Sequence, residues 1–182
     1  MGLRTIADHI MDIVQNSFNA GATRIVLTII ENSSGTFYFK VEDNGRGMDE
    51  EELQKVFDPF YTTRDHRIRK VGLGLPFLKY AAELTGGKVS IQSQKGVGTI
   101  VEATFNTRHV DCQDVGDLAG TISTLLLMAN DVELVVKRFK DEEGYQLSSS
   151  ELKQKFGDLS SPIVMKVVFD LIEELEASLK KG

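Results

Sequence analysis

The sequence predicts an α/β fold, because stretches with helical spacing alternate with stretches that have the two-residue period of strands. The first stretch, residues 3–20, repeats apolar side chains three and four positions apart and ends before Gly21. The next two, TRIVLTIIE (23–31) and TFYFKVED (36–43), are separated by the turn signal NSSG. Apolar and polar residues alternate in the second of them, so we expect one buried face.

The same patterns continue to the end of the chain. We expect helices over 48–57, 75–87, 117–130 and 162–180, strands over 88–94, 97–105, 132–139 and 144–148, and a loop over 58–74. Ser148 and Glu151 have the spacing of a capping box, which predicts a short helix after Ser148. Composition shifts after Phe105, so we expect a first domain over 1–106 and a small α+β extension over 107–182.

The composition is that of a soluble globular protein, with 182 residues, 41% hydrophobic and 26% charged. The formal net charge of −6 argues against a nucleic-acid partner. The single cysteine, Cys112, fits a reducing compartment. No apolar run approaches the roughly 20 residues of a membrane span, and the N-terminus lacks a signal-peptide pattern. We therefore expect a cytoplasmic protein without a membrane partner.

The helix end DIVQNSFNAGAT (12–23) aligns a carboxylate and a carboxamide. Asp12 and Asn16 are four residues apart, so they project from the same face of the helix. Two such side chains are either simply solvated or hold a metal ion and a water molecule.

Two glycine-containing segments follow. In VEDNGRGMD (41–49) a strand ends at Asp43, and Gly45 and Gly47 allow a ligand to approach the backbone. Asp43 could accept a hydrogen bond from an amine such as that of adenine, or the segment is an acidic surface turn. In VGLGLPFLKY (71–80), Gly72 and Gly74 precede a helix, whose free N–H groups and dipole favour phosphate, unless this is only a flexible loop.

A basic segment, TTRDHRIRK (62–70), lies between these two. It carries four cations in an otherwise acidic protein: Arg64, Arg67, Arg69 and Lys70. It is either a mobile lid that meets terminal phosphates or a solvated basic loop. Thr99, in GVGTIVEATF (96–105), either faces the same pocket or belongs to a plain β-turn.

Together these segments resemble an ATP-binding family. DIVQNSFNAGAT, DNGRGM, VFDPFYTTR and GLGLPFLKYAAELTGGKVSIQSQKGVGTIVEATF occur in the order of the N, G1, F and G2 boxes of the Bergerat fold. This fold is shared by histidine kinases, Hsp90 chaperones, DNA gyrase and MutL proteins. NSFNAGATRI resembles the MutL version of the N box, and the later boxes resemble the histidine-kinase version. The resemblance covers about residues 3–106. It implies a two-layer α/β sandwich with a mixed, mostly antiparallel sheet and helices on one face.

The resemblance also implies roles for the matching residues, with ATP and Mg²⁺ as ligands. Asn16 would be the Mg²⁺ ligand, and Asp12 would hold the attacking water at a position where much of the family has glutamate. Asp43 would receive the adenine amino group with support from Thr99, Gly45 and Gly47 would shape the adenine pocket, and Gly72 and Gly74 would lie against the phosphates. The other nucleotide-binding residues would be Met48, Arg64, Lys70 and Leu73.

Three functions are compatible with these patterns. The first is an ATPase or a protein kinase subunit that transfers phosphate to a partner protein. The second is a nucleotide-controlled regulatory module of the anti-sigma-factor type, and the third is an interaction protein with a nucleotide-sensing pocket. The N box begins near residue 3, and His9, His66 and His109 do not resemble an acceptor site, so we expect no phospho-acceptor domain.

The last predicted helix bears on the oligomeric state. It carries an apolar stripe at Val164, Val168, Leu171, Leu175 and Leu179. This stripe either packs on the body of a monomer or on a second copy in a homodimer.

Overall fold

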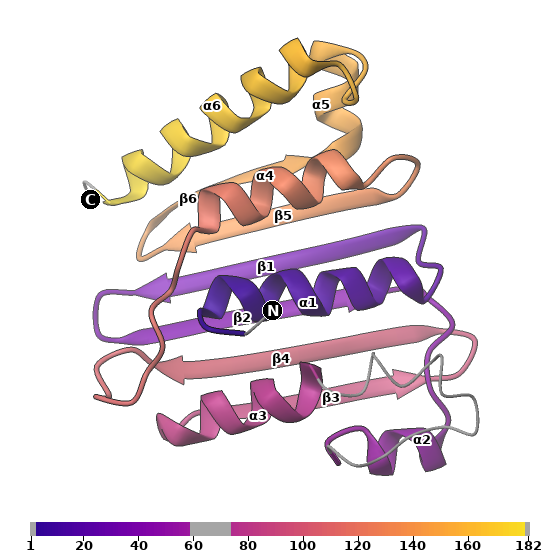
Figure 1. The fold of residues 1–182 in the computed structure, drawn as a ribbon, viewed down its shortest axis with the longest axis vertical. Helices are drawn as coiled ribbons and strands as arrows, with labels where there is room; N and C mark the ends of the chain where they lie inside the picture. The colour runs from indigo at the N-terminus through magenta and orange to yellow at the C-terminus, as the bar shows by residue number, and fades with distance from the viewer. Residues whose placement is uncertain (1–2, 59–73, 181–182) are drawn as a thin grey trace.

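The computed structural model describes residues 3–58 and 74–180. One sheet with the strand order β3-β4-β2-β1-β5-β6 runs through the molecule, and helices pack against it (Figure 1). The helices are α1 (Ile6–Asn19), α2 (Glu50–Lys55), α3 (Gly74–Leu84), α4 (Leu118–Met128), α5 (Ser149–Phe156) and α6 (Pro162–Lys180). The strands are β1 (Arg24–Asn32), β2 (Thr36–Asp43), β3 (Lys88–Gln94), β4 (Gly98–Asn106), β5 (Glu133–Lys140) and β6 (Glu143–Ser148).

The sheet is mixed and mostly antiparallel, as predicted. β2 pairs with β1 and β4, β3 with β4, and β6 with β5, all antiparallel. The exception is β5, which runs parallel to β1 in the register Ile25↔Leu134 and Leu27↔Val136. Residues 107–182 therefore contribute two strands to the same sheet as residues 1–106.

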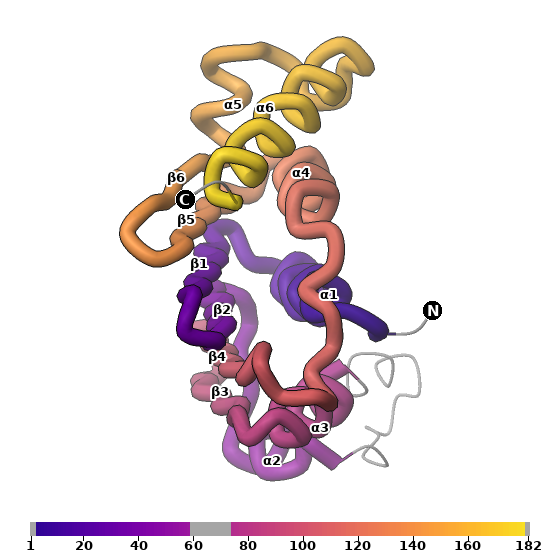
Figure 2. The backbone as a smooth tube through the Cα atoms, turned by 90° about the vertical axis from the view of Figure 1, so that its left-hand side faces the viewer, coloured from indigo at the N-terminus to yellow at the C-terminus, as the bar shows by residue number. Residues whose placement is uncertain are grey.

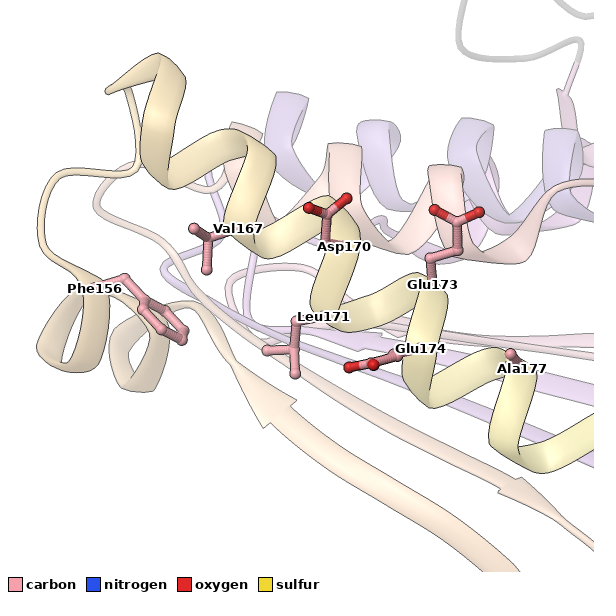
Figure 3. A pocket seen from close by; sticks show the side chains of 7 residues that line it. All are labelled: Phe156, Val167, Asp170, Leu171, Glu173, Glu174 and Ala177. Atoms are coloured by element: carbon pink, nitrogen blue, oxygen red, sulfur yellow. The ribbon is translucent and has the colours of Figure 1, made fainter.

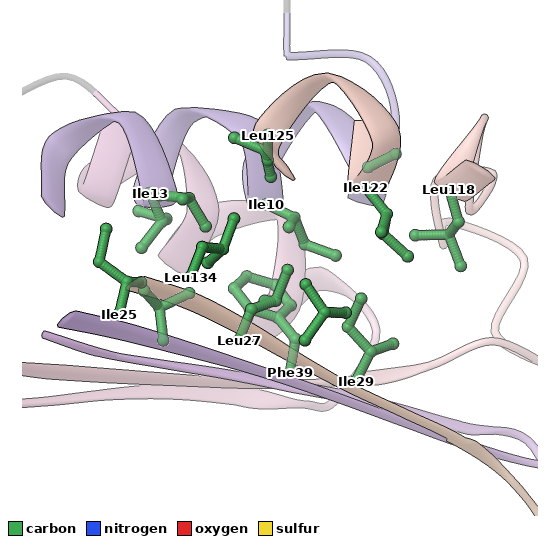
Figure 4. Close-up of a cluster of buried hydrophobic side chains, with 14 of the residues drawn as sticks. Ile10, Ile13, Ile25, Leu27, Ile29, Phe39, Leu118, Ile122, Leu125 and Leu134 are labelled. Carbon is green, nitrogen blue, oxygen red and sulfur yellow. The ribbon is translucent and has the colours of Figure 1, made fainter. Parts of the chain in front are cut away.

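The helices α1, α3 and α4 cover one face of this sheet (Figure 2). The core fills the space between the two layers, and its central side chains come from α1, α4, β1, β2 and β5 (Figure 4). They are Ile10, Ile13, Ile25, Leu27, Ile29, Phe39, Ile122, Leu125 and Leu134, none more than 3% exposed. Burying a side chain of this size contributes roughly 1.5–3 kcal/mol, so this layer contact is the main source of stability.

Local signals place the helix ends. Thr5 begins α1 with a capping box, in which its hydroxyl accepts from the Asp8 N–H and the Asp8 side chain accepts from the Thr5 N–H. Ser148 begins α5, and its side chain accepts from the Glu151 N–H, as the sequence predicts. Within the described ranges, no helix combines the length and apolar character that crossing a membrane requires.

A buried polar group joins α6 to the last two strands. Arg138 on β5 forms an ion pair with Glu176 on α6, with 3.0 Å between Nε and Oε2. The Tyr145 hydroxyl on β6 donates to the same carboxylate at 2.6 Å, and Arg138 Nη2 lies 2.7 Å from Glu31 Oε1. The predicted apolar stripe of α6 faces the body here, with Val168 and Leu179 buried.

Candidate functional site

Asp12 and Asn16 lie on the same helix, α1, and each is partly buried. Asp12 lies against the start of α3, where a Cβ added to Gly74 would overlap its carboxylate. Burial raises the pKa of Asp12 above its ordinary value. Within residues 3–58 and 74–180, no donor forms a hydrogen bond with the Asp12 carboxylate or with the Asn16 carboxamide. Both groups are therefore available to a ligand.

Asp43, at the end of β2, is held by two donors. The Ser17 hydroxyl donates to Oδ2 at 2.6 Å, and the backbone N–H of Gly45 donates to Oδ1 at 2.9 Å. Ser17 is buried on α1, directly after Asn16, so this bond ties the end of α1 to the end of β2. Each carboxylate oxygen keeps a further lone pair, so Asp43 can accept another hydrogen bond while its orientation is fixed.

Ser93 on β3 connects the segment after Asp43 to the start of β4. Its Oγ accepts from the Met48 N–H at 2.8 Å and lies 2.8 Å from Thr99 Oγ1 and 3.0 Å from the carbonyl oxygen of Gly98. Thr99 is in turn the direct strand partner of Asp43. Ser93 therefore holds Met48 and Thr99 close to each other and beside Asp43.

Position 47 requires a glycine for two reasons. Its φ of +68° lies in the region that favours glycine, and a Cβ there would overlap the carbonyl oxygen of Gln94. The segment from Gly45 to Met48 can therefore pack flat against the β3–β4 turn. The Gly96 N–H also donates to the carbonyl oxygen of Arg46 at 2.7 Å.

The structure thus brings most of the predicted residues into two adjoining groups. Asp12 and Gly74 are in contact, and Asn16 is next to Ser17, which binds Asp43. The second group contains the remaining described candidates, which are connected by Ser93 and by the strand pairing of Thr99 with Asp43. They are Asp43, Gly45, Gly47, Met48 and Thr99. Arg64, Lys70, Gly72 and Leu73 lie outside the described residues.

Two serines in this site, Ser17 and Ser93, are not marked as site residues by any motif in the sequence. Ser17 occupies the buried face of α1, where a polar side chain needs a partner, and that requirement was the available signal. Ser93 lies in an alternating strand, where its side chain is one of several polar candidates.

A metal ion at this site would not be held by a cluster of acidic or histidine side chains from residues 3–58 and 74–180. The described residues contain no group of three or more His, Cys, Asp or Glu side chains placed to hold one. Mg²⁺ takes oxygen ligands, usually one or two from protein together with phosphates and water. The carboxamide of Asn16, which has no hydrogen-bond partner in the described part of the chain, fits that pattern.

The comparison with known proteins identifies the family. Residues 3–109, more than half of the chain, match the histidine kinase-, DNA gyrase B- and HSP90-like ATPases. The chain belongs to this family. The predicted fold class and the resemblance are thereby confirmed, and membership of an ATPase family supports ATP binding.

Individual relatives match parts of the chain. It is similar to the sensor histidine kinase YvrG of Bacillus subtilis, with 32% identity over 82 residues, which are 44% of this chain and 14% of that protein. The cell-division control histidine kinase PdhS of Brucella anthropi is 28% identical over 120 residues, covering 59% of this chain and 11% of the relative. The chain therefore matches only a small part of the length of these kinases.

The fold is also found in a solved structure. The Aquifex aeolicus MutL ATPase domain complexed with ADP gives a TM-score of 0.55 at 18% identity, covering 87% of this chain and 69% of that chain. At this identity the likeness shows the fold alone. It extends beyond residue 109, the end of the family match.

Proposed function

We propose that the chain binds Mg·ATP between α1, the end of β2 and the start of α3, and that it transfers or hydrolyses the terminal phosphate. The observation that carries the proposal is the fixed carboxylate of Asp43. Its two donors, Ser17 and Gly45, orient it without using all of its acceptor capacity. An exocyclic amine such as that of adenine would complete its hydrogen bonds.

The phosphates would lie towards Asn16 and the start of α3. α3 is 11 residues long and begins at Gly74, where a glycine lets the backbone approach a neighbour closely. Its first N–H groups and its dipole favour an anion. Asn16 would offer its carboxamide oxygen to Mg²⁺, which when bound supplies positive charge to the phosphates. In the same proposal Thr99 supports the adenine site, and Gly47 and Met48 form one of its walls.

Asp12 is our candidate for the general base. Its carboxylate is unpaired among the described residues, and the raised pKa makes it a stronger base than an exposed aspartate. It would take the proton from a water molecule, or from a hydroxyl or imidazole of a partner, as that nucleophile bonds to the γ-phosphorus and ADP leaves. Its own negative charge opposes direct contact with phosphate, so we place it one water molecule away.

The decisive experiment measures phosphate release and ATP affinity side by side for wild type, Asp12→Asn and Asn16→Ala. Asp12→Asn should leave affinity nearly unchanged and reduce turnover by roughly 10²–10⁴-fold, the usual contribution of a general base. Asn16→Ala should remove the Mg²⁺ dependence of binding. Gln15→Ala, an exposed neighbour on the same helix, is the matched control and should resemble wild type.

The outcomes separate the alternatives. Hydrolysis by Asp12→Asn at the wild-type rate would exclude Asp12 as the base. Tight ATP binding with no turnover in wild type would favour the regulatory module over the enzyme. If Asn16→Ala binds ATP with unaltered Mg²⁺ dependence, the metal is held elsewhere.

A further inference from the structure

A shallow hollow of about 580 Å³ lies between α5 and α6 (Figure 3), and both helices lie at the β6 end of the sheet, away from the central strand β2 that carries Asp43 (Figure 1). Phe156 at the end of α5 forms one side of it. Val167, Leu171 and Ala177 line it from successive turns of α6. None of these residues belongs to the proposed nucleotide site.

The apolar surface continues beyond the hollow. Phe156 is 37% exposed and Val167 is 38% exposed, although both are large apolar side chains. One turn before Val167, on the same side of α6, Ile163 is 78% exposed. A single exposed apolar residue is ordinary, but a contiguous group on two adjoining helices indicates an interaction surface.

The polar residues of the hollow all carry the same charge. Asp170, Glu173 and Glu174 line it, and no lysine or arginine does among the described residues. Asp170 is paired with Lys166 at 3.1 Å, whereas Glu173 and Glu174 form no ion pair with a described residue. The hollow therefore has an apolar floor with uncompensated negative charge beside it, which a cationic and apolar surface would complement.

We propose that this hollow docks a basic amphipathic segment of a partner protein, such as a helix with lysine or arginine on one side and apolar residues on the other. Helices of this kind bind grooves through anchors three and four positions apart. The proposal goes beyond ATP binding and does not depend on it.

A second copy of this chain fits the same surface less well. A two-fold contact is formed by identical patches, so each copy would bring its own Glu173 and Glu174, which pair with no described residue, to the interface. Those charges would be desolvated close to one another without a cation in the hollow. A partner of opposite charge avoids that cost.

The hollow is also preformed, because α6 is fixed from its other side. Glu176 bonds Arg138 and Tyr145, and Ile172 and Val168 are fully buried. A partner would therefore not have to order this helix in order to bind, which removes one cost of association.

Fluorescence anisotropy on the full chain tests the proposal. The probe is a labelled 18-residue peptide of leucine and lysine at helical spacing, and the same peptide with glutamate in place of lysine is its counterpart. We expect saturable binding of the lysine peptide only. Phe156→Ala with Val167→Ala should weaken it by roughly tenfold or more, because the anchors of an interface carry most of its affinity.

Charge variants give an independent measurement. Glu173→Gln with Glu174→Gln should weaken binding of the lysine peptide a few-fold, which is the usual effect of losing exposed charge pairs. The matched control, Glu142→Gln with Glu143→Gln, removes two exposed carboxylates from the β5–β6 hairpin and should leave binding unchanged. Circular dichroism verifies that all variants are folded.

Three results would overturn the proposal. The first is no saturable binding of the lysine peptide. The second is equal weakening of peptide binding by the Glu142/Glu143 variant and by the Glu173/Glu174 variant. That result would mean that the peptide is attracted to the acidic protein in general. The third is a wild-type dimer that Phe156→Ala with Val167→Ala dissociates, which would assign the surface to a second copy.

Discussion

Replacing Glu176 by alanine should destabilise the fold by about 3–4 kcal/mol, because it leaves a buried arginine without its main partner. Arg138 is 3% exposed and Glu176 is 6% exposed. Two guanidinium nitrogens of Arg138 and the Tyr145 hydroxyl all donate to the Glu176 carboxylate. The interaction is therefore almost fully shielded from water, unlike the exposed pair between Lys166 and Asp170 on the same helix.

The magnitude follows from what remains after the substitution. Breaking a buried ion pair costs about 3–5 kcal/mol, chiefly through the charge left behind. Here Glu31 still lies 2.7 Å from Arg138, so part of that charge stays compensated and the lower end of the range applies. The Tyr145 hydroxyl loses its acceptor as well, and an unsatisfied buried donor costs about 1–3 kcal/mol. We therefore do not expect a loss below about 3 kcal/mol.

Urea unfolding followed by circular dichroism measures this loss, with Glu173→Ala as the control on the same helix. That exposed residue should change the free energy of unfolding by less than about 0.5 kcal/mol. The Tm of Glu176→Ala should fall by roughly 6–16 °C, at about 2–4 °C per kcal/mol for a chain of this size.

A double variant separates charge from packing. Arg138→Met with Glu176→Leu removes both charges, and apolar replacements of a buried pair are often neutral or stabilising, so it should recover most of the loss. A cost of under about 1 kcal/mol for Glu176→Ala would refute the reasoning, since α6 would then be held by its apolar contacts alone.

Three further predictions concern the site and the core. Asp43→Asn should weaken ATP binding by about 1.5–3 kcal/mol, because that is the value of a hydrogen bond to a charged group. A calorimetric titration measures this loss. If wild type binds ATP and GTP with equal affinity, the role given to Asp43 is contradicted. Gly74→Ala should reduce phosphate release by up to roughly 10²-fold, because the new Cβ displaces Asp12; unchanged turnover would show that their contact is unimportant. Burial lowers the pKa of His9, so the unfolded chain takes up a proton at a higher pH than the native ring does. The free energy of unfolding should therefore decrease as the pH falls from 7.5 to 5.5, and it should decrease less in His9→Gln; equal slopes would assign the effect to other groups.

The sequence predicted the individual elements because their signals are local. Apolar spacing gave α1 and α6, alternation gave β2, and the Ser148 cap gave the start of α5. The glycines also carried information, since Gly47 is required both by its φ and by the approach of Gln94.

The side-chain partners inside the site could not be predicted in the same way. Ser17 and Asp43 are 26 positions apart, and their bond depends on how α1 crosses the end of β2. Arg138 and Glu176 are a similar case, 38 positions apart. A glutamate on an otherwise apolar helix stripe reads as a surface residue until its arginine partner on β5 is known.

The position of β5 illustrates the same limit at the level of the sheet. Its central residues, Leu134 to Val136, form a continuous buried run, which is typical of a strand that is covered on both faces. Such a run does not name its neighbours, and a parallel pairing needs a long crossover that leaves no turn signal. Here the connection from β4 runs through α4, which packs on α1 and α6, and β5 then pairs with β1. The edge of β1 that does not face β2 is thus paired with β5, which comes from the C-terminal part of the chain. One continuous sheet therefore supports Asp43 beside β4 and the α5–α6 hollow beside β6.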